Sequence, residues 1–316
     1  MSNYVLNREI DLDNLPQELF ERLDDAQKKK DRIVRPSKSY WQDAWARLKK
    51  DPLAMIGIVT IAIIVVFAIF GPMLSPYTYD GQNIADQNQG PTLKHIFGTD
   101  KFGRDIFVRT LYGARISLSI GVVAAVINLG IGVVYGGISG YFGGRVDMVM
   151  MRIIDILIGI PSLLYIILIM MFLGNTVTSI LIALCLTYWI GTARMVRSQV
   201  LSLKHQEYTL AARVIGASDI RILFKHLIPN SMGPIIVTVT FLIPSAIFNE
   251  AFLSFLGIGI QVPMASWGTL ANDAIPTLFT YPYQMLFPSL AISITMFALN
   301  FIGDGLRDAL DPRLKK

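Results

Sequence analysis

The side chains that most often do covalent or metal chemistry are scarce in this sequence. Its 316 residues include one cysteine, Cys185, and three histidines, His95, His205 and His226, which lack the spacing of a metal-ligand set. The sequence contains no Gly-x4-Gly-Lys-Ser/Thr loop of the kind that holds nucleotide phosphates. We therefore expect no catalytic residue and no metal site, no cofactor bound by this chain, and no nucleic-acid partner.

Ionisable residues inside apolar segments are the next candidates for chemistry. Glu250 is such a residue, and groups of this kind usually face a bundle interior or a water-filled cavity and have a partner. Basic residues from another segment are candidates for that partner: Arg104, Arg109 and Arg115. A second acid, Asp155, has Arg152 one helical turn away, and we expect these two to pair.

Residues 207–230 form the longest polar stretch after residue 110, and they lie between two apolar runs. Helix formers from Glu207 onward lead up to Gly216, which predicts a short helix that stops at this glycine. Ser218 can cap a second helix that ends before Pro229. Small residues that would let a partner approach closely are Ala211, Ala212 and Gly216. The pattern predicts a docking elbow, with an ordinary connecting loop as the alternative.

Membrane-spanning helices must position these residues. Hydrophobic residues make up 53% of the chain and charged residues 16%, with a mean hydropathy of +0.51, whereas soluble domains average about 45–50% and about 25%. Six apolar segments each approach the roughly 20 residues that cross a hydrocarbon core; they cover about 53–74, 116–141, 153–173, 176–193, 233–259 and 286–306. The predicted fold is an all-α polytopic membrane protein with six transmembrane helices, the third and fourth joined tightly at Gly174.

The basic residues predict the orientation. If the N-terminus is cytosolic, 23 of the 28 Lys and Arg residues lie in or beside cytosolic segments, and the other five lie in one outer segment, 94–115. Both termini and residues 207–230 are then cytosolic, whereas 80–110 and 260–285 face outward.

The chain divides into four predicted regions. These are a cytosolic N-terminal region (1–52) with an amphipathic helix at about 15–30 and an interfacial elbow helix at 39–50, the first span with its external loop (53–115), a five-helix core (116–306) and a cytosolic tail (307–316). In the outer loop, Thr99 or Asp100 can cap a helix and Asp105 can pair with Arg109. Glycines at four-residue spacing, Gly132, Gly136 and Gly140, predict close helix packing. We place Ile235 on a lipid-facing side of the fifth span.

Several longer motifs carry a resemblance to a known family. The order Glu207, Ala211–Ala212, Gly216 and Pro229 resembles the EAA loop of the membrane subunits of ABC importers. Tyr208 and Thr209 stand between the Glu and the first Ala, as in the peptide-transporter branch. Further stretches resemble the C-type permease subunit of oligopeptide and dipeptide importers: HIFGTDKFGRDIFVR (95–109), YGARISLSIG (112–121), EAFLSFLGIG (250–259), SWG (266–268) and GDGLRDALDPRLKK (303–316).

The resemblance implies a fold, partners and roles. It implies a type I ABC importer transmembrane domain in the cell membrane, forming half of a pathway for peptides. The partners would be a related permease in a heterodimer, two ATP-binding subunits that hold ATP and magnesium, and an external or periplasmic substrate-binding protein. The coupling residues would be Glu207, Ala211, Ala212, Gly216 and Pro229. Glu250, Arg104 and Arg109 become candidates for the pathway or an outer gate, with structural pairing as their alternative role.

Other functions are compatible with the composition. A self-sufficient secondary transporter or channel predicts several ionisable groups within the membrane or an inverted repeat, and only one acid lies well inside a span. A membrane scaffold would not need the elbow, and an ABC permease for nickel chelates would share all of these motifs.

Overall fold

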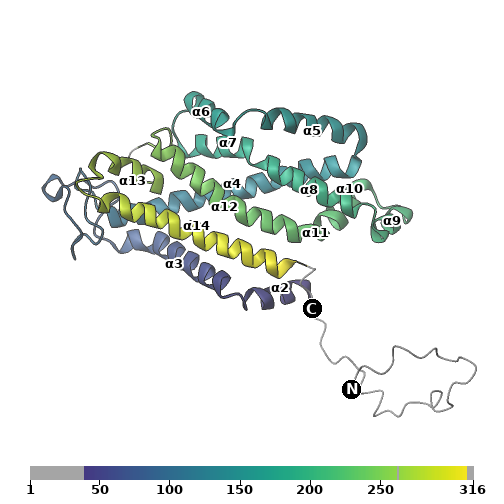
Figure 1. Cartoon of the computed structure of the whole chain (residues 1–316), viewed down its shortest axis with the longest axis horizontal. Helices are drawn as coiled ribbons and strands as arrows, with labels where there is room; N and C mark the ends of the chain where they lie inside the picture. The colour runs from purple at the N-terminus through teal and green to yellow at the C-terminus, as the bar shows by residue number, and fades with distance from the viewer. Residues whose placement is uncertain (1–38, 262, 312–316) are drawn as a thin grey trace, which may run out of the picture. The chain divides into compact units, whose positions relative to one another are not determined.

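The computed structural model describes residues 39–261 and 263–311, and their regular secondary structure is helical (Figure 1). The predicted amphipathic helix at 15–30 lies outside the described residues. The long helices are α3 (Pro52–Leu74), α4 (Ile106–Phe142), α5 (Gly144–Ile158), α6 (Ser162–Leu173), α7 (Val177–Thr187), α8 (Trp189–Leu203), α12 (Met232–Phe255) and α14 (Tyr283–Leu310). The shorter helices are α2 (Tyr40–Leu48), α9 (Glu207–Val214), α10 (Asp219–Arg221), α11 (Ile228–Asn230) and α13 (Trp267–Ala274), with a π-helix at Ile222–Leu227 and 3-10 turns at Ile84–Asp86 and Ile275–Thr277.

Five of the six predicted spans correspond to single long apolar stretches among the described residues. These are Pro52–Leu74, Ile106–Phe142, Val177–Leu203, Met232–Phe255 and Tyr283–Leu310. The second begins at Ile106 rather than 116, so the predicted region boundary at 115 falls inside α4. The reason is that Arg109 and Arg115, which marked this stretch as loop, both find partners in the folded chain. The last span also continues past 306 to Leu310, into the predicted tail.

The predicted third span differs from a simple helix. It consists of α5, which starts at Gly144, and α6. A short break separates the two helices, and the chain bends by 78° there. Pro161 explains the break, because proline has no N–H and the residue before it avoids helical geometry. The tight connection from α6 to α7 is confirmed, with Gly174 at φ +80.

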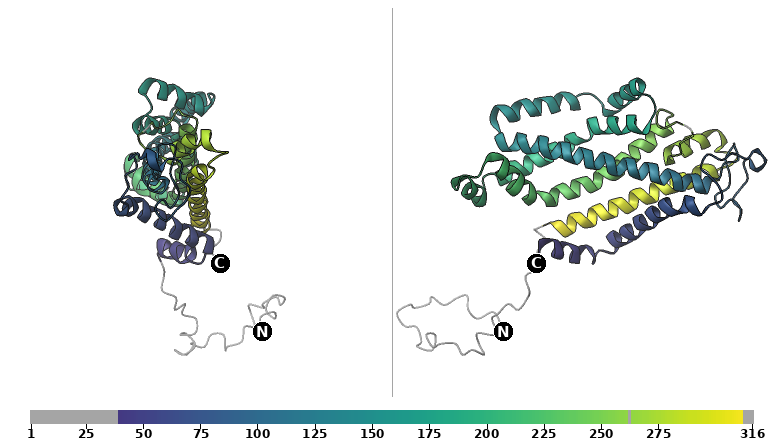
Figure 2. Two further views of the ribbon diagram at one scale, coloured as in Figure 1. Left: turned by 90° about the vertical axis from the view of Figure 1, so that its left-hand side faces the viewer. Right: turned by 180° about the vertical axis from the view of Figure 1, so that it is seen from behind.

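Helix α4 is the central element, and it packs against α8, α12 and α3 (Figures 1 and 2). The predicted role of its glycines in packing is confirmed. A Cβ added at Gly136 would lie 2.2 Å from the Ala193 carbonyl oxygen, and one at Gly140 would lie 2.8 Å from that of Arg197. Any larger residue at these two positions would push α8 away.

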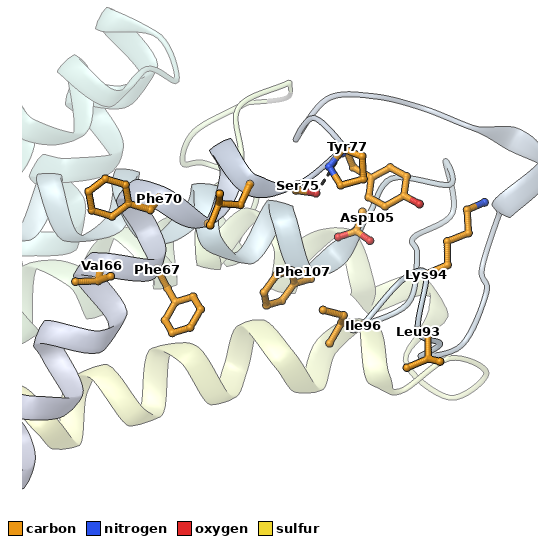
Figure 3. Close-up of a pocket in the computed structure, with 13 residues that line it drawn as sticks. Val66, Phe67, Phe70, Ser75, Tyr77, Leu93, Lys94, Ile96, Asp105 and Phe107 are labelled. Carbon is orange, nitrogen blue, oxygen red and sulfur yellow. Dashed lines mark hydrogen bonds between the residues drawn. The ribbon is translucent and has the colours of Figure 1, made fainter.

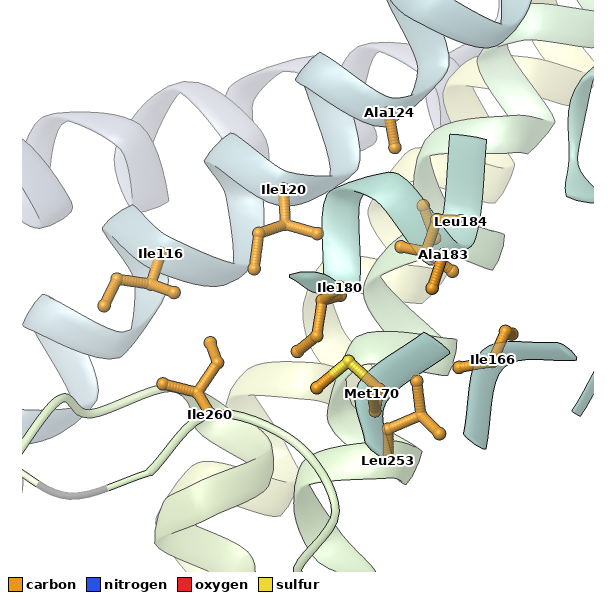
Figure 4. Close-up of a cluster of buried hydrophobic side chains, with 11 residues drawn as sticks. Ile116, Ile120, Ala124, Ile166, Met170, Ile180, Ala183, Leu184, Leu253 and Ile260 are labelled. Atoms are coloured by element: carbon orange, nitrogen blue, oxygen red, sulfur yellow. The ribbon is translucent and has the colours of Figure 1, made fainter. Parts of the chain in front are cut away.

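The interior between α4, α6, α7 and α12 is filled by aliphatic side chains (Figure 4). Ile120, Met170, Ile180 and Leu253 are among its members, and each is at most 1% exposed. The cluster lies nearer the N-terminal end of α4 than the glycine contacts do, and it packs α6 and α7 onto the long helices despite the bend in the third span.

Helix α3 is held against α4 by an arginine. Pro72 lies inside α3 and lacks an N–H, which leaves the Ala68 carbonyl without its helical partner. Arg115 of α4 donates to the carbonyl oxygens of Ala68 and Ile69. The guanidinium therefore satisfies the backbone that the proline exposes. Before α3, a helix is confirmed at Tyr40–Leu48, while its position in the membrane interface stays a prediction.

Candidate functional site

The first half of the 207–230 elbow folds as predicted. Helix α9 ends at Val214, and Gly216 adopts φ +84. The Gly216 N–H donates to the Arg213 carbonyl at 3.0 Å, and the Ala217 N–H donates to the Ala212 carbonyl at 3.0 Å. This pair of bonds is a Schellman motif, which needs a left-handed residue at the glycine position.

The second half of the elbow corrects the prediction. The helix that starts after Ser218 does not end before Pro229, because α10, the π-helix Ile222–Leu227 and α11 follow one another without a gap. Pro229 is the second residue of α11, directly after the π-helix, so the proline does not end the helical segment. Ser218 is the N-cap residue but makes no side-chain capping bond.

The elbow is anchored to the end of α4 through Tyr141. The Tyr141 hydroxyl donates to Asp219 Oδ1 at 2.5 Å and accepts from Arg213 Nη2 at 3.5 Å. The bond to Tyr141 raises the pKa of the Arg213 guanidinium. Lys204 Nζ donates to the Gly140 carbonyl at 3.1 Å, which joins the end of α8 to α4. The middle of the elbow and the end of α8 that precedes it are therefore both fixed to the end of α4.

The elbow's small residues face different ways. Ala212 is 6% exposed and packs on this chain's own Ile222, Leu223 and Leu227, so it belongs to the internal core and not to a free docking face. Ala211, Glu207, Gly216 and Pro229 are exposed. Ile235 is fully buried in the same cluster, so its predicted lipid-facing position is wrong.

The exposed surface of the elbow is formed by large apolar side chains. These were not among the residues singled out from the sequence. Val214 is 86% exposed, Ile215 83% and Ile220 70%. The sequence could have identified these residues, because the predicted helix–Gly–helix elbow places the residues next to Gly216 at its tip. Exposed apolar side chains that cluster on a fixed turn mark an interaction surface.

At the opposite end of α4, Arg104 and Arg109 belong to a buried charge network. Arg104 Nε donates to Asp100 Oδ2 at 2.6 Å, and its Nη2 donates to Asp273 Oδ2 at 2.9 Å. Arg109 is fully buried, and its Nη2 lies 3.2 Å from the same Asp273 oxygen. Two arginines and two aspartates thus join the outer loop to the end of α13. Asp273, which supplies this link, was not singled out from the sequence.

Asp105, rather than Thr99 or Asp100, caps the helix that follows the outer loop. Its Oδ1 accepts from the Val108 N–H at 2.9 Å, and its Oδ2 lies 2.8 Å from His95 Nδ1. The carboxylate is thus committed to the cap and to His95, which is why the predicted pair with Arg109 does not form.

Glu250 does not pair with an arginine, which corrects the prediction. It is fully buried, and two serine hydroxyls donate to its carboxyl oxygens, Ser117 at 2.7 Å and Ser254 at 2.9 Å. The three candidate arginines are engaged elsewhere. The carboxyl group joins α4 to α12, so its observed contacts are structural.

The short helix α13 packs beside this carboxyl group. Ser266 caps it with a capping box that includes Thr269. Trp267 is 1% exposed, and its indole N–H donates to the Thr110 carbonyl at 3.0 Å. A Cβ at Gly268 would lie 2.4 Å from the Ala251 carbonyl oxygen. The SWG motif therefore holds α13 against α4 and α12.

A pocket of about 530 Å³ lies between α3 and the outer loop (Figure 3). Phe67, Phe70 and Phe107 contribute to its mainly apolar wall, and Lys94 lies at its rim. The Lys94 ammonium donates to Asp86 at 2.9 Å, which lowers the pKa of the Asp86 carboxyl. The pocket's lining does not include Arg104 or Arg109.

Helices long and apolar enough to span a membrane, together with a fixed elbow that has an exposed apolar tip, define a polytopic membrane protein. Residues 132–316 match the family described as the inner membrane component of binding-protein-dependent transport systems, and residues 39–91 match the N-terminal membrane domain of oligopeptide transport permease C. The chain belongs to this family of transport permeases. Asp155 pairs with Arg194 of α8 at 2.7 Å and not with Arg152 of its own helix, which corrects the prediction.

Curated relatives align with this chain over most of its length. The chain is 51% identical to the dipeptide transport system permease protein DppC of Bacillus subtilis over 303 residues, which are 96% of this chain and 95% of that protein. It is 52% identical to the oligopeptide transport system permease protein OppC of the same organism, over 96% of this chain and all of that protein. Identity to OppC of Escherichia coli K12 is 43%, over 87% of this chain and 92% of that protein.

Proposed function

We propose that this chain forms half of the membrane path for short peptides in an ATP-driven importer. The relatives' names, which are those of dipeptide and oligopeptide permeases, support the cargo. In this proposal a related permease completes the pathway, a binding protein delivers the peptide outside, and two cytosolic subunits bind ATP and magnesium. This chain then has no hydrolytic role of its own, and both of its termini are cytosolic.

The elbow is the single observation that carries the coupling role. Its tip presents Val214, Ile215 and Ile220 to solvent, and the Schellman turn and Tyr141 hold that tip on the helix bundle. We assign it to the ATPase subunit because it is a fixed, exposed apolar surface at the end of the bundle that the charge asymmetry predicts to be cytosolic. In this proposal the exposed residues Glu207, Ala211, Gly216 and Pro229 also contact the ATPase subunit, whereas Ala212 acts indirectly through the core of the elbow.

Helix α4 provides the connection between the elbow and the outer network. It has 37 residues, which corresponds to about 55 Å at 1.5 Å per residue. Arg109 lies in its first turn and Tyr141 in its last. A shift of the elbow during ATP-driven closure can therefore move Arg109 relative to Asp273. In this way Arg104 and Arg109 would act as an outer gate that opens when the network is pulled apart.

The test is co-expression with the candidate sister permease and ATP-binding subunits. We expect the four subunits to co-purify and, in proteoliposomes, to hydrolyse ATP faster with peptide-loaded binding protein and to take up labelled peptide. If the complex takes up a nickel chelate and no peptide, the transported substrate is the chelate and the peptide proposal is wrong. Purification of a lone chain that transports by itself would contradict the coupling role. Membership in the permease family already argues against a channel, a secondary transporter or a scaffold.

A further inference from the structure

The break between α5 and α6 lies at membrane depth. The two helices have 15 and 12 residues, so they rise only about 22 Å and about 18 Å, and neither alone crosses a core of roughly 30 Å. Helix α5 starts at the end of the bundle where α4 and α8 both finish, as the bond from Lys204 to Gly140 shows. The α5–α6 pair must therefore cross the bundle before α7–α8 returns, and the break falls inside that crossing (Figure 1).

Backbone groups at this break lack partners among the described residues. Pro161 cannot donate to the Leu157 carbonyl, and the Tyr165 hydroxyl takes that place at 3.0 Å. No acceptor within the described chain receives the N–H groups of Ile160, Ser162 or Leu163. Residues 158–164 are all exposed. Lipid cannot hydrogen-bond such groups, so non-helical backbone at this depth must lie in protein or line a water-filled space.

An exposed ion pair lies one turn from the break. Arg194 Nη2 donates to Asp155 Oδ1 at 2.7 Å, and the two side chains are 47% and 48% exposed. The Asp155 carbonyl accepts the Gly159 N–H at 3.1 Å, which places the pair directly beside the break. Charged groups that face lipid are costly, and those in spans usually mark a polar path. Two independent features therefore mark this face as wetted.

We propose that residues 155–163, together with Arg194, line the water-filled path that the peptide follows; this inference rests on the function proposed above. Free N–H groups can bond to the carbonyls of a peptide main chain, which is common to all peptides. The exposed Ile156, Ile160 and Leu163 side chains offer apolar contact without selecting one sequence. Water and the passing peptide occupy this face. A sister subunit packed tightly on it would have to bury a half-exposed ion pair and leave the free N–H groups unpaired.

Cysteine accessibility in the assembled four-subunit complex tests this assignment. Ile160→Cys and Ser162→Cys would be made in a Cys185→Ser background, with Ile63→Cys as the matched control. Ile63 is 50% exposed on the apolar face of α3, which is a continuous helix. The probe is a charged, membrane-impermeant methanethiosulfonate, applied to proteoliposomes with and without ATP and peptide-loaded binding protein.

We expect the break cysteines to react at least about tenfold faster than Ile63→Cys, because the reactive thiolate forms in water and not in lipid. Modification should block peptide uptake, and transported peptide should slow the modification. Unreactive break cysteines in every nucleotide state, in a complex that still imports peptide, would overturn the pathway assignment and leave the proposed function standing. Labelling only by a lipid-dissolved maleimide would also overturn it. A wild-type complex that imports no peptide would instead overturn the proposed function.

Discussion

Replacement of the exposed apolar tip of the elbow should separate subunit docking from folding. Val214 and Ile215 are 86% and 83% exposed in this chain, so Val214→Ser and Ile215→Ser should change its own stability by less than about 0.5 kcal/mol. Full burial of such a side chain is worth about 1.5–3 kcal/mol. If the ATPase subunit covers both, each substitution weakens association by about tenfold to a hundredfold.

The assay is capture of the ATP-binding subunits by the tagged permease pair in detergent, followed by peptide-stimulated ATP hydrolysis in proteoliposomes. Leu93→Ser is the matched control, since Leu93 is fully exposed but lies in the outer loop. Ala212→Trp provides the contrast. Ala212 is 6% exposed and packed against Ile222 and Leu223, so the added bulk should cost about 1–3 kcal/mol of stability as well as association.

The Val214→Ser/Ile215→Ser double variant tests whether the elbow tip is needed for docking and not for folding. We expect normal amounts of both permease subunits in the membrane and little bound ATPase. Wild-type capture and wild-type stimulated hydrolysis in this double variant would refute the assignment of the elbow tip as the docking surface. Lost capture together with a lowered unfolding temperature would refute the claim that the tip is not needed for folding.

Four further outcomes are expected. Gly216→Val should lower stimulated hydrolysis more than Gly216→Asn does, because φ is +84 and Asn adopts this left-handed conformation more readily than a β-branched residue; equal effects would contradict this. Glu250→Gln should lower the unfolding temperature only slightly and Glu250→Leu should lower it strongly, because the partners are serine hydroxyls that can donate or accept a hydrogen bond. A large decrease in the Gln variant would mean that Glu250 has a cationic partner after all. Asp273→Asn should lower the unfolding temperature more than Asp86→Asn, because Asp273 faces two buried arginines and broken buried pairs cost on the order of 3–5 kcal/mol, less with partial exposure. In a Cys185→Ser background, an impermeant thiol reagent on intact cells should label Gly90→Cys and spare Ile220→Cys; the reverse pattern would invert the topology.

The features that the sequence alone determined are those that depend on neighbours along the chain. Apolar segments of about 20 residues cross a membrane wherever they pack, so the spans could be placed from composition. The stop at Gly216 follows from local backbone geometry, and the four-residue glycine spacing puts Gly132, Gly136 and Gly140 on one helix face. The bend in the third span also had a local cause, Pro161, although its angle did not follow from the sequence.

The features that only the tertiary structure decided are those in which residues distant along the chain meet. Glu250 takes serines rather than arginines because α4 presents Ser117 to it, while Arg104 and Arg109 are drawn to Asp273 on α13. Asp155 pairs across to Arg194 for the same reason. The two neighbouring alanines of the elbow differ because successive helical residues point about 100° apart, and only the position of the π-helix core decides that Ala212 is the buried one. A charge or a methyl group in a bundle takes its partner from whichever helix lies opposite, and that depends on how every span packs at once.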